Sequence, residues 1–241
     1  MDRWQKSAPV RKIILFSSVD GPGNRSAVFL QGCNFNCRYC HNPETRNVYE
    51  PGISKMSAEE VMEQVSKNIP FIRGITVSGG ECMLYPEFVK ALFKLCKEKG
   101  LGTLIDSNGS VDFRNHTELL DVTDGVMLDI KAWDNDEHLS VTDASNTQVL
   151  ANALYLAEAG KLYEVRTVVV PGLFDYEQTI TETAKLLKPF LENEDIRYKL
   201  IKYRNFGVRK EYKIYKSPSA ELMKSLNDTA KAAGFKNVVV V

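Results

Sequence analysis

The chain has 241 residues, 44% of them hydrophobic, and its 31 lysines and arginines balance 31 aspartates and glutamates, so the formal net charge is zero. Nucleic-acid-binding proteins usually carry a basic excess, so this balance counts against that class. No apolar run approaches the roughly 18 residues of a membrane-spanning helix, and the first ten residues lack the apolar core of a secretory signal. Five cysteines fit a reducing compartment rather than a disulfide scaffold, so we expect a cytoplasmic protein.

Short apolar runs, rich in β-branched residues, recur along the chain and predict strands. Several of them are almost continuously apolar, which is typical of strands buried on both faces of a parallel sheet. The predicted strands are Lys12–Phe16, Ala27–Gln31, Gly74–Ser78, Leu101–Asp106, Gly125–Lys131, Leu162–Val170, Arg197–Tyr203 and Asn237–Val241.

Amphipathic segments between these strands predict helices. The first is expected to begin at Ser57, which forms a capping-box pattern with Glu60. Alternating strands and helices predict an α/β fold, and roughly six βα units favour a barrel or partial barrel in one domain. The predicted helices are Ser57–Asn68, Pro86–Lys99, Asn146–Ala159, Tyr176–Phe190 and Ser217–Ala233, and three of them stop before a glycine.

Polar or glycine-rich residues accompany five of the predicted strands. In a barrel, the carboxyl ends of the strands share one rim, and active sites are built there. A purely structural barrel has no need of such groups, so we expect a binding or catalytic site at this rim. The residues concerned are Cys33, Gly79–Glu81, Asp106–Asn108, Asp129 with Lys131, and Arg166.

Three cysteines, Cys33, Cys37 and Cys40, form a C-x3-C-x2-C pattern. Thiolates at this spacing favour zinc or an iron–sulfur cluster, but a structural zinc site needs four protein ligands. His41 follows Cys40 directly and is poorly placed to be the fourth, and Cys82 is distant in sequence. We therefore favour a three-cysteine cluster with one iron left open. The alternatives are a zinc site completed by His41 or Cys82, and an incidental run of cysteines.

The cysteine pattern, with Tyr39 just before its last member, resembles the signature of the radical S-adenosylmethionine (SAM) superfamily. From about Ile14 to Gly172, and more weakly beyond, the chain is similar to the glycyl-radical-enzyme activases of that superfamily, of the single-cluster, formate-lyase-activating type. Six motifs carry the resemblance in order: VDGPGNR (Val19–Arg25), QGCNFNCRYCHNP (Gln31–Pro43), SGGE (Ser78–Glu81), DSNG (Asp106–Gly109), VMLDIK (Val126–Lys131) and RTVVVPG (Arg166–Gly172).

The resemblance implies a single radical SAM domain over residues 1–241, built as a partial (β/α)6 barrel. Residues 1–11 would be an N-terminal extension and residues 204–241 a weakly matched C-terminal part. A [4Fe–4S] cluster would be held by Cys33, Cys37 and Cys40, with SAM chelating the open iron. The implied reaction cleaves SAM reductively to a 5'-deoxyadenosyl radical, which takes a Cα hydrogen from a glycine of a partner such as pyruvate formate-lyase. Such an oxidoreductase belongs to anaerobic metabolism.

The resemblance also assigns roles to residues at the strand ends. Lys131 and Arg166 are expected to hold the ribose, the carboxylate and the substrate backbone, and they join the three cysteines as catalytic residues. SAM is expected to contact Tyr39, His41, Gly79, Gly80, Glu81, Asp129, Ile130, Lys131 and Arg204. A monovalent cation beside the SAM carboxylate is expected to have Asp106, Ser107, Met127 and Asp129 as ligands.

Each of these residues also has a purely structural explanation. The SGGE glycines can form an ordinary turn, Asp106 and Asp129 can be ordinary strand-end carboxylates, and Tyr39 can be a core side chain. Lys131 and Arg166 can be exposed charges, although a bare charge at Arg166, inside an apolar strand, would be costly.

Residues outside the strand ends receive simpler assignments. We place His116 and His138 on the surface because their sequence neighbours are polar. Cys96 is expected in a helix core, and Cys82 as a small buried side chain.

Residues in a loop near the N-terminus and in the stretch after the strand Arg197–Tyr203 are expected to lie at the edge of the site or to meet a partner. Asp20 and Arg25 are expected to shape the mouth of the site. Arg204 stands where the activases carry a histidine, so the SAM contact either persists through Arg204 or is lost. Phe206–Tyr212 is expected to meet the partner protein.

We expect two protein partners, a glycyl-radical enzyme as substrate and a flavodoxin- or ferredoxin-like electron donor, and neither nucleic acid nor membrane. Two alternative functions remain: a radical SAM enzyme that acts on a small molecule or another substrate, and a non-enzymatic zinc-binding module. A neighbouring gene for a glycyl-radical subunit would favour the activase, and zinc in anaerobically purified protein would favour the binding module.

Overall fold

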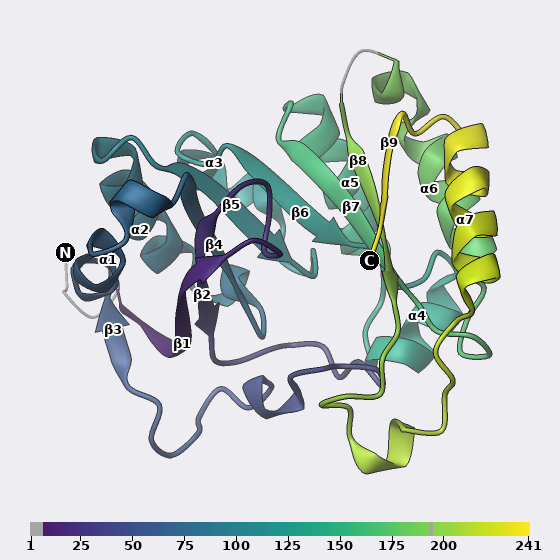
Figure 1. Ribbon diagram of the computed structural model, residues 1–241, viewed down its shortest axis with the longest axis horizontal. Coiled ribbons are helices and arrows are strands. Elements are labelled where there is room, and N and C mark those ends of the chain that lie inside the picture. Colours follow the sequence, from purple (N-terminus) through teal and green to yellow (C-terminus); the bar gives the residue numbers. More distant parts are fainter. Residues whose placement is uncertain (1–6, 193–194) are drawn as a thin grey trace. The chain divides into compact units, whose positions relative to one another are not determined.

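The computed structural model describes residues 7–192 and 195–241 (Figure 1). They divide into two compact units. The first comprises the residues up to Asn34 together with Glu44–Ser107 and Phe113–Val126, and the second comprises Phe35–Pro43, Asn108–Asp112 and Met127–Val241. The expectation of one domain over residues 1–241 stays a prediction.

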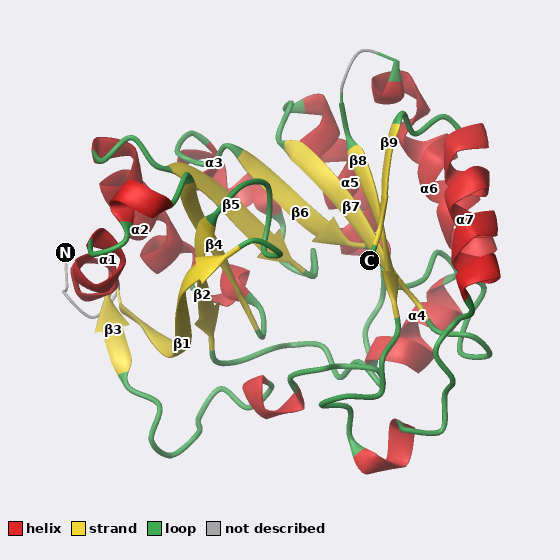
Figure 2. Cartoon of the chain, in the orientation of Figure 1, coloured by secondary structure: helices red, strands yellow, loops and turns green. Residues whose placement is uncertain are grey.

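The first unit contains a mixed sheet in the strand order β3-β1-β2-β4-β5 (Figure 2, yellow). Strand β1 runs antiparallel to both β2 and β3, whereas β2, β4 and β5 run parallel to one another. All four strands predicted in this unit are present, and β3 is additional. Their bounds are β1 (Ser7–Ser17), β2 (Arg25–Leu30), β3 (Lys55–Ser57), β4 (Gly74–Gly79) and β5 (Gly102–Ser107).

Strand β1 departs from the sequence expectation in two ways. It begins at Ser7, so residues 7–11, expected in an N-terminal extension, are part of the sheet, and residues 1–6 lie outside the described range. It is also antiparallel and only partly buried, with Leu15 and Phe16 37% and 53% exposed. The expectation of a parallel strand buried on both faces is therefore wrong for Lys12–Phe16, because an antiparallel sheet can leave one face in water.

The helices of the first unit begin and end as their caps dictate. At the start of α1 (Ala58–Ser66), the Ser57 hydroxyl accepts from the Glu60 amide at 3.2 Å, and Glu60 accepts from the Ser57 amide at 2.7 Å, which confirms the capping box. Helix α2 (Pro86–Glu98) ends before Gly100, whose φ of +68° favours glycine. Cys96 is fully buried in α2, as expected. The short α3 (Thr117–Leu120) was not predicted.

The second unit contains parallel strands covered by helices. Strand β8 lies between β7 and β9 and runs parallel to both, and β6 begins in the first unit and ends in the second. The predicted strands and helices of this region are all present, and α4 is additional. Their bounds are β6 (Gly125–Asp129), α4 (Asn135–Thr142), α5 (Thr147–Glu158), β7 (Leu162–Val169), α6 (Tyr176–Leu191), β8 (Arg197–Lys202), α7 (Ala220–Ala232) and β9 (Asn237–Val240).

The surface position expected for His138 is wrong. Its side chain lies in α4 and is completely buried. Nδ1 donates to the Ala144 carbonyl at 2.6 Å, and the ring packs edge-on against Phe35, with 5.5 Å between the ring centroids. Polar neighbours in the sequence concealed this position, since they cap the helix and cover its outer face. His116 is half-buried.

The buried His138 predicts an acid-sensitive fold. Burial lowers the pKa of His138 below its ordinary value, so the unfolded chain binds more protons at this position than the folded chain does. The stabilising effect of a neutral His138 is complete above the unfolded pKa of about 6.5 and is lost as the pH falls below it. We expect urea unfolding to show a free energy that declines with acidification, and a shallower decline in His138→Gln. An unchanged slope in that variant, with His116→Gln as control, would contradict this.

Among the described residues, no helix has both the length and the hydropathy required to cross a bilayer.

Candidate active site

The loop that carries the three cysteines (residues 33–43) is called the cysteine loop below. In the first unit, the chain leaving β2 is held to the segment that follows this loop. The amide of Gly32 donates to the Thr45 carbonyl at 2.7 Å, and the amide of Cys33 donates to the Arg46 carbonyl at 2.9 Å. The buried side-chain amide of Gln31 donates to the Glu44 and Asn47 carbonyls, both at 2.8 Å. Gln31 thus fixes the backbone beside Cys33, a role that its place in the QGC motif did not reveal.

Gly79, the last residue of β4, and Gly80, which follows it, bring the end of that strand against the same chain. The Gly80 amide donates to the Leu30 carbonyl at 2.9 Å, and the Glu81 amide donates to the Gly32 carbonyl at 2.7 Å. A Cβ on Gly79 would lie 2.2 Å from the Leu30 nitrogen, and one on Gly80 would lie 2.1 Å from the Gly32 oxygen. Glycine is therefore required here by close approach of the protein's own backbone, whatever these residues also bind.

Glu81 lies directly after these glycines and is 1% exposed. Its Oε1 accepts from the Met83 amide at 2.9 Å and from the Ser107 hydroxyl at 2.8 Å. Next to it, the Ser78 hydroxyl donates to Asp106 Oδ2 at 2.9 Å. The ends of β4 and β5 therefore present two oriented carboxylates, and the structure brings together Gly79, Gly80, Glu81, Asp106 and Ser107.

Cys82 lies beside this group and is a small buried side chain, as expected. It is fully buried, and its thiol donates to the Asp106 carbonyl at 3.3 Å. Burial raises the pKa of the Cys82 thiol well above its ordinary value, and the carboxylates of Glu81 and Asp106 raise it further. A thiol that resists ionisation is a poor metal ligand, since the thiolate is the form that binds.

Replacing Cys82 by alanine is accordingly expected to leave iron binding unchanged. The only cost is the thiol's hydrogen bond and packing, about 1 kcal/mol in the free energy of unfolding. Iron and sulfide per chain, assayed after anaerobic reconstitution, should match wild type for Cys82→Ala and fall sharply for Cys40→Ala. Equal losses in both variants would make Cys82 a ligand.

In the second unit, the end of α4 braces the cysteine loop. The amide of Asn36 donates to the Thr142 carbonyl at 2.8 Å, and the amide of Arg38 donates to the Val141 carbonyl at 2.9 Å. The Asn36 side chain donates to Asp143, which ends the helix with a left-handed φ of +61°. The loop therefore depends on a helix that the sequence did not disclose.

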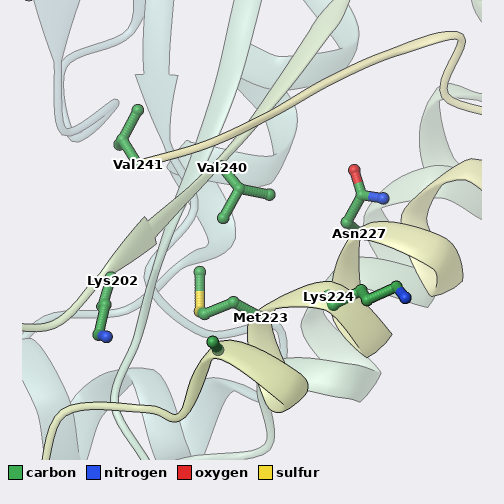
Figure 3. Close-up of a pocket in the computed structure, with 7 residues that line it drawn as sticks. Lys202, Met223, Lys224, Asn227, Val240 and Val241 are labelled. Carbon is green, nitrogen blue, oxygen red and sulfur yellow. The ribbon is translucent and has the colours of Figure 1, made fainter.

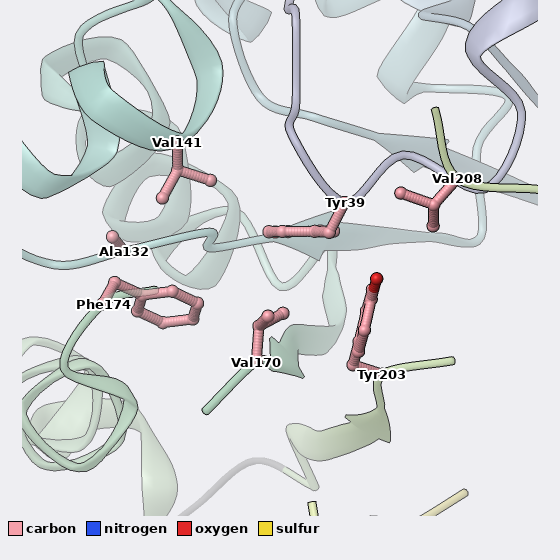
Figure 4. Packing of buried hydrophobic residues seen from close by; sticks show 7 residues of the cluster. All are labelled: Tyr39, Ala132, Val141, Val170, Phe174, Tyr203 and Val208. Atoms are coloured by element: carbon pink, nitrogen blue, oxygen red, sulfur yellow. The ribbon is translucent and has the colours of Figure 1, made fainter. Parts of the chain in front are cut away.

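Tyr39 points from this loop into an apolar cluster (Figure 4). Its ring is 4% exposed, and its Oη is buried without a hydrogen-bond partner among the described residues. Burial raises the pKa of Tyr39 far above its ordinary value, and the nearby charge of Lys131 offsets part of that rise. The cluster comprises Tyr39, Ala132, Val141, Val170, Phe174, Tyr203 and Val208.

Lys131 joins Tyr39 to Asp129. Its Nζ lies 5.8 Å from the centroid of the Tyr39 ring and 2.8 Å from Asp129 Oδ2. Burial is the largest single influence on Lys131 and lowers its pKa. The charges of Asp129, Tyr39 and Cys37 and the hydrogen bond to Asp129 together overcome it, so the pKa of Lys131 lies well above its ordinary value. Lys131 is thus a buried, protonated amine and not an exposed charge. Ile130, which lies between Asp129 and Lys131 in the sequence, is buried. Its amide donates to the Arg166 carbonyl at 2.9 Å.

The segment after β8 holds the other side of the cysteine loop. The ring of His41 contacts the Arg204 carbonyl through Nε2 at 2.8 Å, and a Cβ on Gly207 would lie 2.1 Å from the His41 oxygen. Arg209 Nη2 donates to the carbonyls of Asn36 and Cys37 at 3.3 and 3.2 Å. The backbone of Arg204 makes the contact, while its side chain is exposed. Its predicted SAM contact stays a prediction.

Arg166 is buried in β7 and belongs to a charge network. Its Nε lies 2.5 Å from Glu164 Oε1, and Arg197 Nη2 lies 2.5 Å from Glu164 Oε2. Arg166 Nη2 also lies 2.7 Å from the sulfur of Met127. Glu164 is completely buried. The alternative that Arg166 is an exposed strand-end charge is wrong, and the carboxylate two residues earlier, on the same face of the strand, was the available signal.

The mouth-shaping role expected of Arg25 is wrong. Arg25 begins β2 and pairs with Gly74, the first residue of β4. Its guanidinium donates to Thr76 Oγ1 at 2.9 Å, to the Ile75 carbonyl at 2.7 Å and to the Gly102 carbonyl at 3.1 Å. These atoms lie at the amino ends of the strands, opposite to the predicted rim. Asp20 lies at that end too, since its carbonyl accepts from Thr76 at 2.5 Å.

A pocket of about 420 Å³ lies in the second unit, between β9 and α7 (Figure 3). Its apolar wall and two lysine stems contain none of the predicted site residues, so it is not the candidate site. The lining residues are Lys202, Ala220, Met223, Lys224, Asn227, Val240 and Val241.

The chain is similar to proteins whose names describe one activity. The Radical SAM superfamily model matches residues 27–187. The pyruvate formate-lyase-activating enzyme of Streptococcus mutans is 40% identical over 202 residues, 80% of this chain and 76% of that protein. A Haemophilus influenzae protein named as a glycyl-radical enzyme activating enzyme is 34% identical over 97% of this chain and 96% of its own length. A domain of a pyruvate-formate lyase-activating enzyme from Bacteroides vulgatus superposes with a TM-score of 0.59 at 23% identity, covering 70% of this chain and 98% of that domain.

The chain therefore belongs to the radical SAM superfamily and, within it, to the glycyl-radical-enzyme activating enzymes. The matches confirm the predicted fold class, a partial (β/α)6 barrel, and the predicted cofactors, a [4Fe–4S] cluster and SAM. They count against the zinc-binding module.

The donor chemistry of the chain fits such a cluster. All five cysteines lie among the described residues, and none of them is in a disulfide. Cys82 and Cys96 are buried, and burial raises the pKa of both thiols, that of Cys96 to about 12. The three cysteines of the motif are each half-buried, in contrast to these two.

Proposed function

We propose that Cys33, Cys37 and Cys40 hold the cluster and that the chain installs a glycyl radical on a partner enzyme such as pyruvate formate-lyase. The observation that carries this is the cysteine loop, whose backbone is held by Val141 and Thr142 on one side and by Arg209 on the other. When bound, the cluster and SAM supply a one-electron cleavage that yields a 5'-deoxyadenosyl radical.

The residues around the loop would bind and orient SAM. We assign to the buried, protonated Lys131 the neutralisation of the SAM carboxylate, and to Glu81, oriented through Oε1 by two hydrogen bonds, acceptance from the SAM ammonium. Tyr39 and its apolar cluster would exclude water from the adenine side. Tyr39 can do this while also serving as a core side chain, so the two interpretations are compatible.

The remaining predicted contacts belong to the same proposal. We keep Asp106, Ser107, Met127 and Asp129 as candidate ligands of a monovalent cation. Oxygen atoms of strand-end carboxylates suit such an ion, and the hydrogen bonds within each unit orient these groups. Arg166, paired with Glu164, is proposed to position the substrate backbone. We also propose contacts of SAM with His41, Gly79, Gly80, Ile130 and Arg204.

Two further elements complete the proposed function. A one-electron donor, flavodoxin-like or ferredoxin-like, would reduce the cluster. A reducing, anaerobic cytoplasm would preserve both the thiolates and the radical product. Neither element requires a nucleic acid or a membrane.

The proposal is tested by loading the protein with iron and sulfide under argon, reducing it, and adding SAM and pyruvate formate-lyase. We expect 5'-deoxyadenosine by chromatography and a glycyl radical by electron paramagnetic resonance, and neither with Cys37→Ala. Absence of 5'-deoxyadenosine from a fully loaded, reducible protein would overturn the proposal. Its formation without a radical on any glycyl-radical enzyme, but with turnover of a small molecule, would favour the alternative radical SAM function.

A further inference from the structure

The segment Arg204–Lys216, hereafter the basic segment, differs in charge from the rest of the chain. It carries five cationic side chains and one carboxylate, a net charge of +4 in 13 residues, whereas the whole chain is neutral. The segment leaves the end of β8, passes through one short 3-10 turn, and leads to α7 (Figure 1, light green). Four of its cations, Arg204, Lys210, Lys213 and Lys216, are exposed.

Two large apolar side chains of the basic segment are also exposed. Phe206 is 86% exposed and Ile214 is 74% exposed. The same stretch does bury apolar side chains, because Val208 is 3% exposed and packs in the cluster around Tyr39. Exposed apolar groups among like charges are typical of an interaction surface.

Contacts with buried residues hold the backbone of the basic segment. Tyr203, just before it, is fully buried, and its hydroxyl donates to the Tyr212 carbonyl at 3.4 Å. The guanidinium of Arg209 lies 4.7 Å from the centroid of the Tyr212 ring. A surface held in one shape loses little entropy when a partner binds.

The basic segment contacts the loop that carries the cysteines. Arg209 donates to the Cys37 carbonyl at 3.2 Å, and the Arg204 carbonyl contacts the His41 ring at 2.8 Å. A protein resting on the exposed side of the segment would therefore be separated from a cluster ligand by one layer of chain. Electron transfer needs this proximity, whereas a glycyl-radical enzyme must deliver a chain segment to SAM.

The size and charge of the surface also favour an electron carrier. Electron-transfer complexes are small and short-lived, and they depend on long-range attraction between opposite charges. A 13-residue segment with a net charge of +4 and two exposed apolar side chains suits such an encounter with an acidic surface.

We propose that the basic segment is the docking surface for an acidic one-electron carrier protein that reduces the cluster. This rests on the proposed function, since it gives the carrier a cluster to reduce. In the step, the carrier is oxidised by one electron, the cluster held by the three cysteines is reduced by one electron, and no bond forms or breaks.

The test compares two reductants on the loaded enzyme. The double charge reversal Lys210→Glu/Lys213→Glu is expected to slow reduction by a purified acidic flavodoxin at least tenfold at low ionic strength, and to weaken the salt dependence of that rate. Reduction by dithionite, which needs no docking, should not change. The matched control is Lys224→Glu/Lys231→Glu, which reverses two exposed charges on α7. It should keep the wild-type rate with both reductants.

A second variant probes the apolar contacts. Phe206→Ser/Ile214→Ser is expected to weaken flavodoxin binding about tenfold while leaving 5'-deoxyadenosine formation with dithionite intact. An unchanged flavodoxin rate in both variants would overturn the proposal. So would normal flavodoxin reduction accompanied by a lost glycyl radical, because the segment would then bind the glycyl-radical enzyme. Failure of the proposed function itself would look different, since dithionite would then yield no 5'-deoxyadenosine from wild type.

Discussion

Replacing Glu164 by alanine is expected to lower the free energy of unfolding by roughly 3 to 5 kcal/mol. Glu164 is completely buried and pairs with Arg166 through one oxygen and with Arg197 through the other. Its removal would take one buried carboxylate away from both Arg166, which is 7% exposed, and Arg197. Urea unfolding followed by circular dichroism measures the loss.

A surface ion pair of similar length provides the control. Lys185 Nζ lies 2.6 Å from Glu182 Oε1 on α6, where the lysine side chain is 70% exposed. Glu182→Ala should cost less than about 1 kcal/mol, since exposed pairs contribute little. Similar losses in the two variants would show that burial does not set the strength of the Glu164 network.

Replacing Gly80 by alanine is expected to displace the chain that leads to Cys33. The new Cβ would lie 2.1 Å from the Gly32 carbonyl oxygen and 2.9 Å from that of Thr45, so the backbone itself must move. We expect a loss of about 3 kcal/mol or more in the free energy of unfolding and a fall in iron bound per chain. Both are measurable on protein reconstituted under argon.

Gly102→Ala is the matched control for this variant. Gly102 is also a glycine of the first unit and begins β5, but a Cβ there would have no neighbour closer than 3.4 Å. Its iron content should equal that of wild type, with a small change in stability. Normal iron binding by Gly80→Ala would show that the Gly32 segment tolerates displacement, contrary to the role argued for the SGGE glycines.

Local signals in the sequence were sufficient for most of the helices and strands. Ser57 and Glu60 marked the start of α1, and Gly100 and Gly160 marked helix ends, because capping depends on residues a few positions apart. Helix α4 (Asn135–Thr142) carried no such periodicity, since its eight residues are mostly polar. Missing that helix also misplaced His138, whose burial depends on Phe35 and Ala144.

The candidate site was predictable to the extent that its chemistry lies in short motifs. The cysteine pattern indicated the cluster, and the SGGE and VMLDIK motifs named Glu81, Asp129 and Lys131. The contacts that hold the site residues in place were not predictable. Arg209 is 172 residues from the Cys37 carbonyl to which it donates. The sequence around either residue gives no indication of this contact.

The strand starts illustrate the same limit. Arg25 lies in a glycine-rich motif, and that motif predicts a place at the mouth of the site. Its partners, Ile75 and Gly102, are 50 and 77 residues away and lie at the opposite ends of the strands. A motif indicates that a residue has a specific role, but it does not indicate at which end of the sheet the residue lies.

The brace around the cysteine loop has a consequence for biosynthesis. The ribosome makes Cys37 long before Arg209, which donates to the Cys37 carbonyl and lies 172 positions later. At roughly 5 to 20 residues per second, that interval is about 10 to 35 seconds. Throughout it the nascent chain displays thiols whose loop is not yet fixed, exposed to oxidants and stray metals. Iron–sulfur delivery is therefore best timed after translation has passed Arg209, when the completed chain can first hold the loop in its final form.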